Sequence, residues 1–182
     1  GSGIEIIVKP GVYREQVTVP ASGVAGSPFV IRASGPGVVI DGADDFSGTV
    51  FWTQLGPTAM PGNLQLQSID NAWLAPSISW APQQVFVNGA RLTPSTALPG
   101  FLPNNSFSWV SGQGLYVNAG GVNPGTQQIL VGRRTYGVSM NAKSWVTIDG
   151  FAITHAEDRG INMKLACTDI VVARNQISFA GS

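Results

Sequence analysis

The feature that most constrains the fold of this chain is an internal repeat in its last third. Gly-Val-Ser-Met at 137–140 returns 23 residues later as Gly-Ile-Asn-Met at 160–163. Val-Thr-Ile at 146–148 returns 24 residues later as Ile-Val-Val at 170–172. A repeat of this length is one supersecondary unit, which buries its apolar face by stacking on the next copy.

Apolar side chains alternate with polar ones inside each copy, as in Val138 and Met140 or Ile161 and Met163. This period of two predicts three short strands per copy, each with one face inward. A leucine-rich repeat is excluded because only Leu165 falls in these two copies. We therefore predict an all-β fold, a right-handed parallel β-helix in which each strand pairs with its equivalent in the next coil.

The sharp corner between the second and third strands should fall at Gly150 in one coil and Asn175 in the next, because both residue types tolerate left-handed backbone. In this register Ile148 stacks on Val172 inside the helix. An aspartate at Val172 would then bury an unpaired charge and prevent folding. The alternative is that the two matching segments are a coincidence in a β-rich chain.

The composition supports a strand-and-turn protein: 43% of the 182 residues are hydrophobic, 11% are charged, and 23 are glycine. The formal net charge of zero argues against a nucleic-acid partner. No apolar run is long enough for a membrane span, and the chain carries no recognisable signal peptide. The single Cys167 excludes an internal disulfide, and we expect it to be a buried, inert thiol.

The repeat pattern is interrupted in the middle of the chain. Val38 to Gly42 matches Val146 to Gly150, which predicts equivalent corners of different coils. We therefore predict first β-helix coils at 1–42, an inserted β-rich subdomain at 43–134, and resumed coils at 135–182.

The insertion should be a small β-sandwich, because it contains several short strand patterns and no copy of the repeat. Four of the five tryptophans lie in it: Trp52, Trp73, Trp80 and Trp109. They could form a sugar-stacking surface, but tryptophans in a small sandwich more often belong to the core.

Several segments resemble the opening of secreted bacterial β-helix proteins of the pectin-lyase-like class. These are Ile-Val-Lys-Pro-Gly-Val-Tyr-Arg-Glu at 7–15, Gly-Ser-Pro-Phe-Val-Ile at 26–31 and Val-Ile-Asp-Gly at 39–42. Further segments resemble the inserted sandwich and resumed helix of β-helical glycoside hydrolases of the β-xylosidase type. These are Val-Phe-Val-Asn-Gly at 85–89, Val-Gly-Arg-Arg at 131–134 and Val-Thr-Ile-Asp-Gly-Phe at 146–151.

The resemblance implies the N-terminal part of an extracellular or periplasmic carbohydrate-active protein whose partner is a polysaccharide or oligosaccharide. A glycoside hydrolase acting on plant or bacterial polysaccharide is the leading expectation, and a polysaccharide lyase is the alternative. In such enzymes the catalytic groups come from later coils, so this segment alone should lack the full active site. A non-catalytic glycan-binding or surface-structural module is the third possibility, since a fold does not imply activity.

The loop that enters the strand at 160–164 should place a row of polar side chains on one rim of the outer face, where a glycan could lie across the coils. The catalytic candidates on this rim are Glu157, Asp158, Arg159 and Lys164. The substrate-binding candidates are His155, Asn162, Ser139 and Asn141.

Two chemistries fit these residue types. A glycosidase would use Glu157 and Asp158 as acid and as nucleophile or base, although adjacent residues are poorly placed to flank one bond. A lyase would use Arg159 or Lys164 as the base, with calcium or a second cation neutralising the uronate carboxylate.

No cofactor is expected, with calcium as the alternative. Asp41, Asp44 and Asp45 are the nearest approach to a calcium site, but aspartates in a glycine-containing loop more often form turns. Arg133 and Arg134 should form a structural ion pair where the insertion rejoins the coils. His155 is the only histidine, so neither a set of histidine ligands nor a serine-type triad is supported.

The sequence stops just before the first strand of a further coil, so the inward residues of the last coil should lose one stacking neighbour. These are Ile161, Met163, Ile170, Val172 and Ile177. We expect further coils or a second chain to cover this end, because the exposed apolar surface is costly.

Overall fold

The computed structural model describes residues 3–55 and 71–181, and it is all-β. Two compact units are present: Gly1–Asp44 with Gly132–Ser182, and Asp45–Val131. We call them the three-sheet unit and the inserted unit. The described residues include no α-helix, only three short 3-10 turns at Thr49–Phe51, Pro99–Phe101 and Pro124–Thr126, and no helix long enough to cross a membrane.

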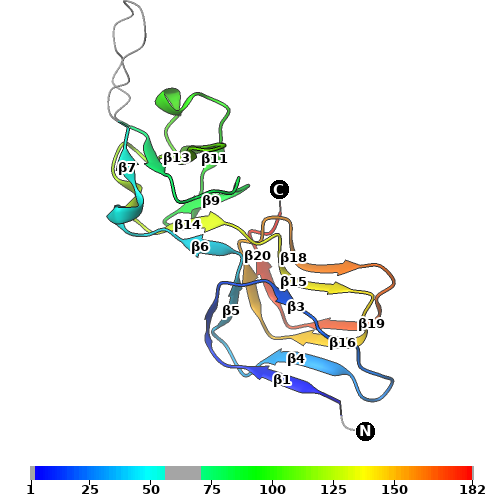
Figure 1. The fold of residues 1–182 in the computed structure, drawn as a ribbon. Helices are drawn as coiled ribbons and strands as arrows, with labels where there is room; N and C mark the ends of the chain where they lie inside the picture. The colour runs from blue at the N-terminus through cyan, green and yellow to red at the C-terminus, as the bar shows by residue number, and fades with distance from the viewer. Residues whose placement is uncertain (1–2, 56–70, 182) are drawn as a thin grey trace, which may run out of the picture. The chain divides into compact units, whose positions relative to one another are not determined.

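The three-sheet unit consists of parallel strands (Figure 1). The first sheet has the order β1 (Glu5–Val8), β4 (Phe29–Ala33), β16 (Ser144–Asp149) and β19 (Thr168–Ala173). The second has the order β2 (Gly11–Tyr13), β5 (Val38–Asp41), β17 (Ala152–Thr154) and β20 (Gln176–Ser178). The third has the order β3 (Val17–Thr18), β15 (Tyr136–Asn141) and β18 (Arg159–Lys164).

Consecutive strands pass from one sheet to the next and then return to the first sheet one strand further along. β15, β16 and β17 form one such coil and pair in parallel with β18, β19 and β20 of the next. Each repeat therefore holds three strands, as the alternation predicts. The predicted stacking of Ile148 on Val172 is also confirmed by the strand register.

One predicted equivalence is wrong. β5 pairs with β17, so Asp41 lies beside Thr154, and it is β4 that pairs with β16. The two Asp-Gly pairs that suggested the match follow strands of different sheets: Asp41 ends β5 and Asp149 ends β16. A glycine is required after each strand for a different reason. Gly150 has a left-handed φ of 81°, whereas a Cβ at Gly42 would lie 2.4 Å from the carbonyl oxygen of His155.

The predicted corner residue of the last coil is also shifted by one. Arg174, with a φ of 53°, is the left-handed equivalent of Gly150. The following Asn175 instead uses its amide group to join two coils. It accepts a hydrogen bond from the N–H of Phe151 and donates one to the carbonyl of Ile148, both at 2.9 Å.

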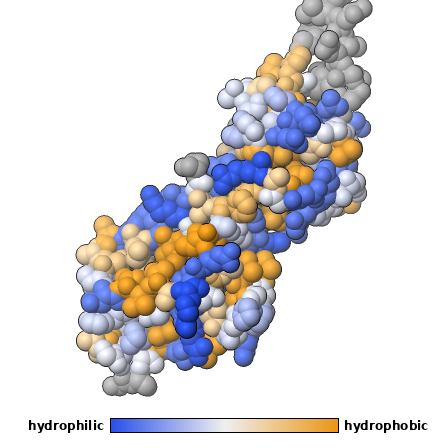
Figure 2. All heavy atoms as spheres, turned by 180° about the vertical axis from the view of Figure 1, so that it is seen from behind, coloured by the Kyte–Doolittle hydropathy of each residue, from blue (hydrophilic) through white to orange (hydrophobic). Residues whose placement is uncertain are grey.

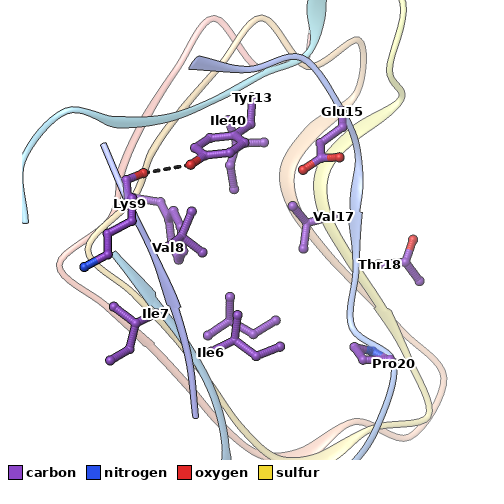
Figure 3. A pocket seen from close by; sticks show the side chains of 12 residues that line it. Ile6, Ile7, Val8, Lys9, Tyr13, Glu15, Val17, Thr18, Pro20 and Ile40 are labelled. Carbon is purple, nitrogen blue, oxygen red and sulfur yellow. Dashed lines mark hydrogen bonds between the residues drawn. The ribbon is translucent and has the colours of Figure 1, made fainter. Parts of the chain in front are cut away.

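The interior of the three-sheet unit is an apolar column built from all three sheets. Its buried members are Val19, Phe29, Ile31, Val38, Ile40, Val138, Met140, Val146, Ile148, Phe151 and Ile153. At the first coil the column ends in a hollow of about 540 Å³. Figure 3 shows Ile6, Val8, Tyr13 and Val17 around this hollow, and the hydroxyl of Tyr13 donates to the carbonyl of Lys9.

The last coil leaves its inward side chains partly open. Met163 is 51% exposed, Val172 45% and Ile177 46%, whereas Met140, Ile148 and Ile153 in the coil before are buried. Figure 2 shows apolar atoms gathered on the surface of the three-sheet unit, in the lower part of that view. That further coils or a second chain cover these residues stays a prediction.

The inserted unit contains two mainly antiparallel sheets. One has the order β10 (Ala90–Arg91), β9 (Val85–Val87), β14 (Ile129–Gly132) and β6 (Ala43–Asp45). The other has the order β11 (Thr93–Pro94), β12 (Ser106–Val110), β13 (Gly114–Asn118), β8 (Trp73–Ala75) and β7 (Thr53–Gln54).

A shared core fills the inserted unit, with Val85, Phe107, Leu115 and Ile129 among its buried members. Its tryptophans pack against this core: Trp52 is buried, and Trp73, Trp80 and Trp109 are partly buried. The core interpretation of these four side chains therefore fits better than the sugar-stacking surface.

The register makes a paired test of the interior possible. Ile148→Asp places a charge where the side chain is fully buried, at a cost of several kcal/mol against a typical total stability of about 5 to 15 kcal/mol. Val172, one coil further along the same stack, is 45% exposed, so Val172→Asp places the charge where water reaches it, and the expectation that this variant fails to fold is wrong. We expect Ile148→Asp to lose its cooperative thermal transition by circular dichroism and Val172→Asp to keep it. Equal losses would contradict the register.

Candidate functional site

The outward side chains of β15 and β18 form a polar surface that we call the β15–β18 face. The strand register places Ser139 beside Asn162 and Asn141 beside Lys164, and Thr18 of β3 extends the first row. Two of the predicted residues, Asp158 and Arg159, lie where the chain enters β18. The structure thus gathers Ser139, Asn141, Arg159, Asn162 and Lys164 on one sheet, with Asp158 in the bend just before β18.

Asn162 is the centre of this face. It alternates with the inward Ile161 and Met163, yet it is only 2% exposed. Its amide nitrogen donates to the hydroxyl of Ser139 at 3.4 Å, and its amide oxygen accepts from the guanidinium of Arg159 at 3.4 Å. The amide is therefore oriented by its neighbours, and sequence alternation predicts its direction but not its burial.

A lysine and an aromatic ring meet on the same face. The ammonium nitrogen of Lys164 lies 5.3 Å from the ring centroid of Tyr136, within the range of a cation–π contact. Tyr136 is at the beginning of β15 and Lys164 at the end of β18, so their long side chains extend toward each other along the strands. Tyr136 is a member of the face that the sequence analysis missed.

The two predicted carboxylates have different surroundings. Asp158 is partly exposed and forms a 3.2 Å ion pair with Arg159. Glu157 is buried, and its main-chain N–H donates to the carbonyl of Arg134 at 2.8 Å. A pair of acids that flanks one scissile bond needs both groups open to the substrate, which this arrangement does not provide.

His155 lies in a buried corner rather than on the predicted outer rim. Its Nδ1 is 2.9 Å from a carboxylate oxygen of Asp41, which also accepts the N–H of Ala43 at 3.0 Å. Arg14 donates to the other carboxylate oxygen at 2.5 Å. The imidazole stacks on the ring of Phe179, with the two centroids 5.5 Å apart. This corner therefore joins residues of successive coils.

The ionisation of Asp41 follows from these contacts. Burial by itself raises the pKa of its carboxyl group. The hydrogen bonds from His155 and Ala43 and the charge of Arg14 lower this pKa, and together they outweigh the effect of burial. The net effect is a pKa below the usual value for aspartate.

The other aspartates considered for calcium are also engaged. Asp44 binds both Arg133, at 2.8 Å, and Arg134, so the ion pair predicted for the two arginines is present. Burial raises the pKa of Asp44 and the two guanidinium groups lower it, with a net decrease. Asp45 accepts a main-chain N–H two residues further on, as a turn aspartate does. Within residues 3–55 and 71–181, no cluster of three acidic, histidine or cysteine side chains could hold a metal.

Cys167 is partly exposed, not buried as predicted. The repeat shift increases from 23 residues at Met140 and Met163 to 24 at Ser144 and Thr168. The turn before β19 is therefore one residue longer than its equivalent before β16. The thiol donates to the carbonyl of Lys164 at 3.3 Å within this longer turn.

No model of a known protein family matches the sequence, and a search of curated proteins finds no match. A search of solved structures finds XylC in its complex with xylose, with a TM-score of 0.58 and 17% sequence identity. The alignment covers 85% of this chain and 30% of XylC, so the chain spans less than a third of that protein's length. At this identity the likeness shows a shared fold.

The corner around Asp41 predicts a specific pH dependence. Its folded-state pKa is below the value of about 3.9 for an unfolded aspartate, so the stabilisation is present above that pH. It is lost as the pH falls through the folded-state pKa. We expect Asp41→Asn to lower the free energy of unfolding by about 1 to 3 kcal/mol at pH 7, and this deficit to shrink below about pH 4.

Urea unfolding between pH 7 and pH 3 measures this difference. Asp169→Asn is the matched control, because Asp169 is exposed and has no ion-pair partner among the described residues. A deficit for Asp41→Asn that stays constant through this range would contradict the assignment.

Proposed function

We propose that this chain is part of a right-handed parallel β-helix protein that acts on carbohydrate, and that the β15–β18 face binds a glycan lying across its strands. The shared fold with XylC, over 85% of this chain, is the observation that carries the proposal. That structure is a complex with xylose. The succession of three parallel sheets and the in-register stacking also support the β-helix.

The residues of the face suit a polyhydroxylated ligand. Asp158 accepts hydrogen bonds from sugar hydroxyls, and the guanidinium of Arg159 and the ammonium of Lys164 donate to sugar oxygens. Ser139 and Asn141 provide neutral polar groups between these charges. Because the rows repeat from strand to strand, successive sugar units can meet similar groups on successive coils.

A glycoside hydrolase is the reaction class that we place first. Asp158 is the partly exposed carboxylate of the face, so it is the candidate acid or hydroxyl ligand, whereas Glu157 is buried. A second carboxylate, from residues outside this chain, would complete the pair that hydrolysis requires. The parent protein would act outside the cytoplasm, in the extracellular space or the periplasm, where polysaccharides are encountered.

One observation favours a polysaccharide lyase as the second candidate. Arg159 and Lys164 bring two cationic groups to the same face, and a uronate polymer carries the carboxylates that they would neutralise. A non-catalytic glycan-binding module is the third candidate and needs only the binding function of the face.

Incubation with xylan-derived oligosaccharides and with uronate polymers separates the three. New reducing ends without ultraviolet absorbance indicate hydrolysis, and absorbance of an unsaturated product indicates elimination. Glycan binding without either product leaves the binding module. Absence of both product and binding would contradict the proposal.

Arg159 and Lys164 are the residues with which to test the binding face. We expect Arg159→Ala and Lys164→Ala each to weaken glycan binding by about tenfold, the effect of losing one charge-assisted hydrogen bond of about 1.5 kcal/mol. Both side chains are exposed, so the melting temperature should change little, with a small decrease for Arg159→Ala because the buried amide of Asn162 loses its 3.4 Å hydrogen bond. Isothermal titration calorimetry and thermal melts provide the two measurements.

Lys9→Ala is the control for these substitutions, because it removes an exposed lysine of the first coil that is not part of the face. The control should bind as the unaltered chain does. A melting temperature several degrees lower with unchanged binding would show that Arg159 and Lys164 serve the fold instead.

A further inference from the structure

The fifth tryptophan, Trp145, lies in the three-sheet unit and has a different environment from the other four. It lines a hollow of about 370 Å³ on the first sheet, in the size range of small-ligand sites. The hollow is bounded by the turn and strand residues Gly26, Pro28, Trp145, Thr147, Asp169 and Val171. None of these residues belongs to the β15–β18 face.

Trp145 and Asp169 occupy equivalent places in adjacent coils. Each follows a paired residue, Ser144 or Thr168, and each precedes one of the next registered pair, Val146 and Ile170. Both have left-handed backbone, with φ of 56° and 54°, which is uncommon for residues other than glycine. The residue pairing of β16 with β19 is interrupted at these two positions, and both side chains line the hollow.

Three polar side chains that line the hollow form no hydrogen bond within the part of the chain that the structure describes. These groups are the indole N–H of Trp145, the carboxylate of Asp169 and the hydroxyl of Thr147. The tryptophans of the inserted unit differ: the indole N–H groups of Trp52 and Trp109 donate to main-chain carbonyls at 3.0 and 3.1 Å.

We propose that this hollow is a binding subsite for a neutral pyranose ring. A pyranose has apolar C–H faces and a rim of hydroxyl groups, so it can stack on an indole and hydrogen-bond at its edge. Asp169 accepts from the sugar hydroxyls, Thr147 donates or accepts, and the indole N–H of Trp145 donates to a sugar oxygen. Pro28 and Val171 provide further apolar contact.

The charge of the hollow selects the class of sugar. Asp169 is the one charged residue in the described lining, and its carboxylate repels the carboxylate of a uronic acid. A neutral pyranoside is therefore favoured here, whereas the β15–β18 face carries two cations. The subsite is independent of that face, so either can fail its test without the other.

Indole N–H resonances in ¹⁵N-labelled protein report on each tryptophan separately, and the Trp145→Phe variant identifies the resonance of Trp145. We expect methyl β-D-xylopyranoside and methyl β-D-glucopyranoside to shift this resonance saturably. The resonances of Trp52 and Trp109 should not move, and methyl glucuronide should have a weaker effect. Absence of a saturable shift with both neutral pyranosides would overturn the proposal.

Asp169→Ala should weaken the pyranoside affinity measured at Trp145 by about tenfold, because it removes a charged hydrogen-bond acceptor. Thr147→Val, which keeps the shape of the side chain, should weaken it less. Arg159→Ala is the matched control on the β15–β18 face and should leave the Trp145 titration unchanged. Thermal melts confirm that the variants are folded, and unchanged affinity in folded Asp169→Ala would also overturn the subsite.

Discussion

Parallel pairing of each strand with its equivalent in the next coil is the constraint on which the rest of the three-sheet unit depends. It fixes which side chains stack inside, as Ile148 does on Val172, and which polar groups form rows outside. The charged residues at the corners between strands also repeat from one coil to the next. Asp149, for example, is flanked by Arg32 in the coil before it and binds Arg174 in the coil after it. A polar row on this fold is therefore a product of register.

The sequence contained enough information to predict the strands of the last two coils, because their apolar residues repeat at nearly constant spacing. The same reasoning misassigned the strand ending at Asp41. Asp-Gly occurs at two corners, once where glycine must be left-handed and once where a side chain would collide with a neighbouring backbone. The sequence pattern is the same whether a glycine is required for left-handed backbone or for lack of space. Arg174 was missed for a related reason, since arginine gives no local signal of left-handed backbone.

For the candidate site, the sequence predicts which side chains point outward but not which of them are buried. Alternation placed Ser139, Asn162 and Lys164 on one face, but burial depends on contacts across the sheet that no local pattern encodes. His155 lies in a buried corner and not on the predicted rim. Its position depends on Asp41, which is 114 positions away in the sequence and which no local pattern connects to it. Alternation with the inward Val146 and Ile148 also places Trp145 outward, but the hollow beside it depends on Gly26 and Pro28, which are far away in the sequence.

The inserted unit leaves the three-sheet unit after β5 and returns before β15, yet β5 and β17 pair without a break in register. Asp44 at its departure binds Arg133 and Arg134 at its return, which fixes the two ends side by side. A segment with adjacent ends can be exchanged without altering the strands around it. The corner after β5 is thus a position that tolerates insertion, where a different module could replace the present one while the coils keep their order.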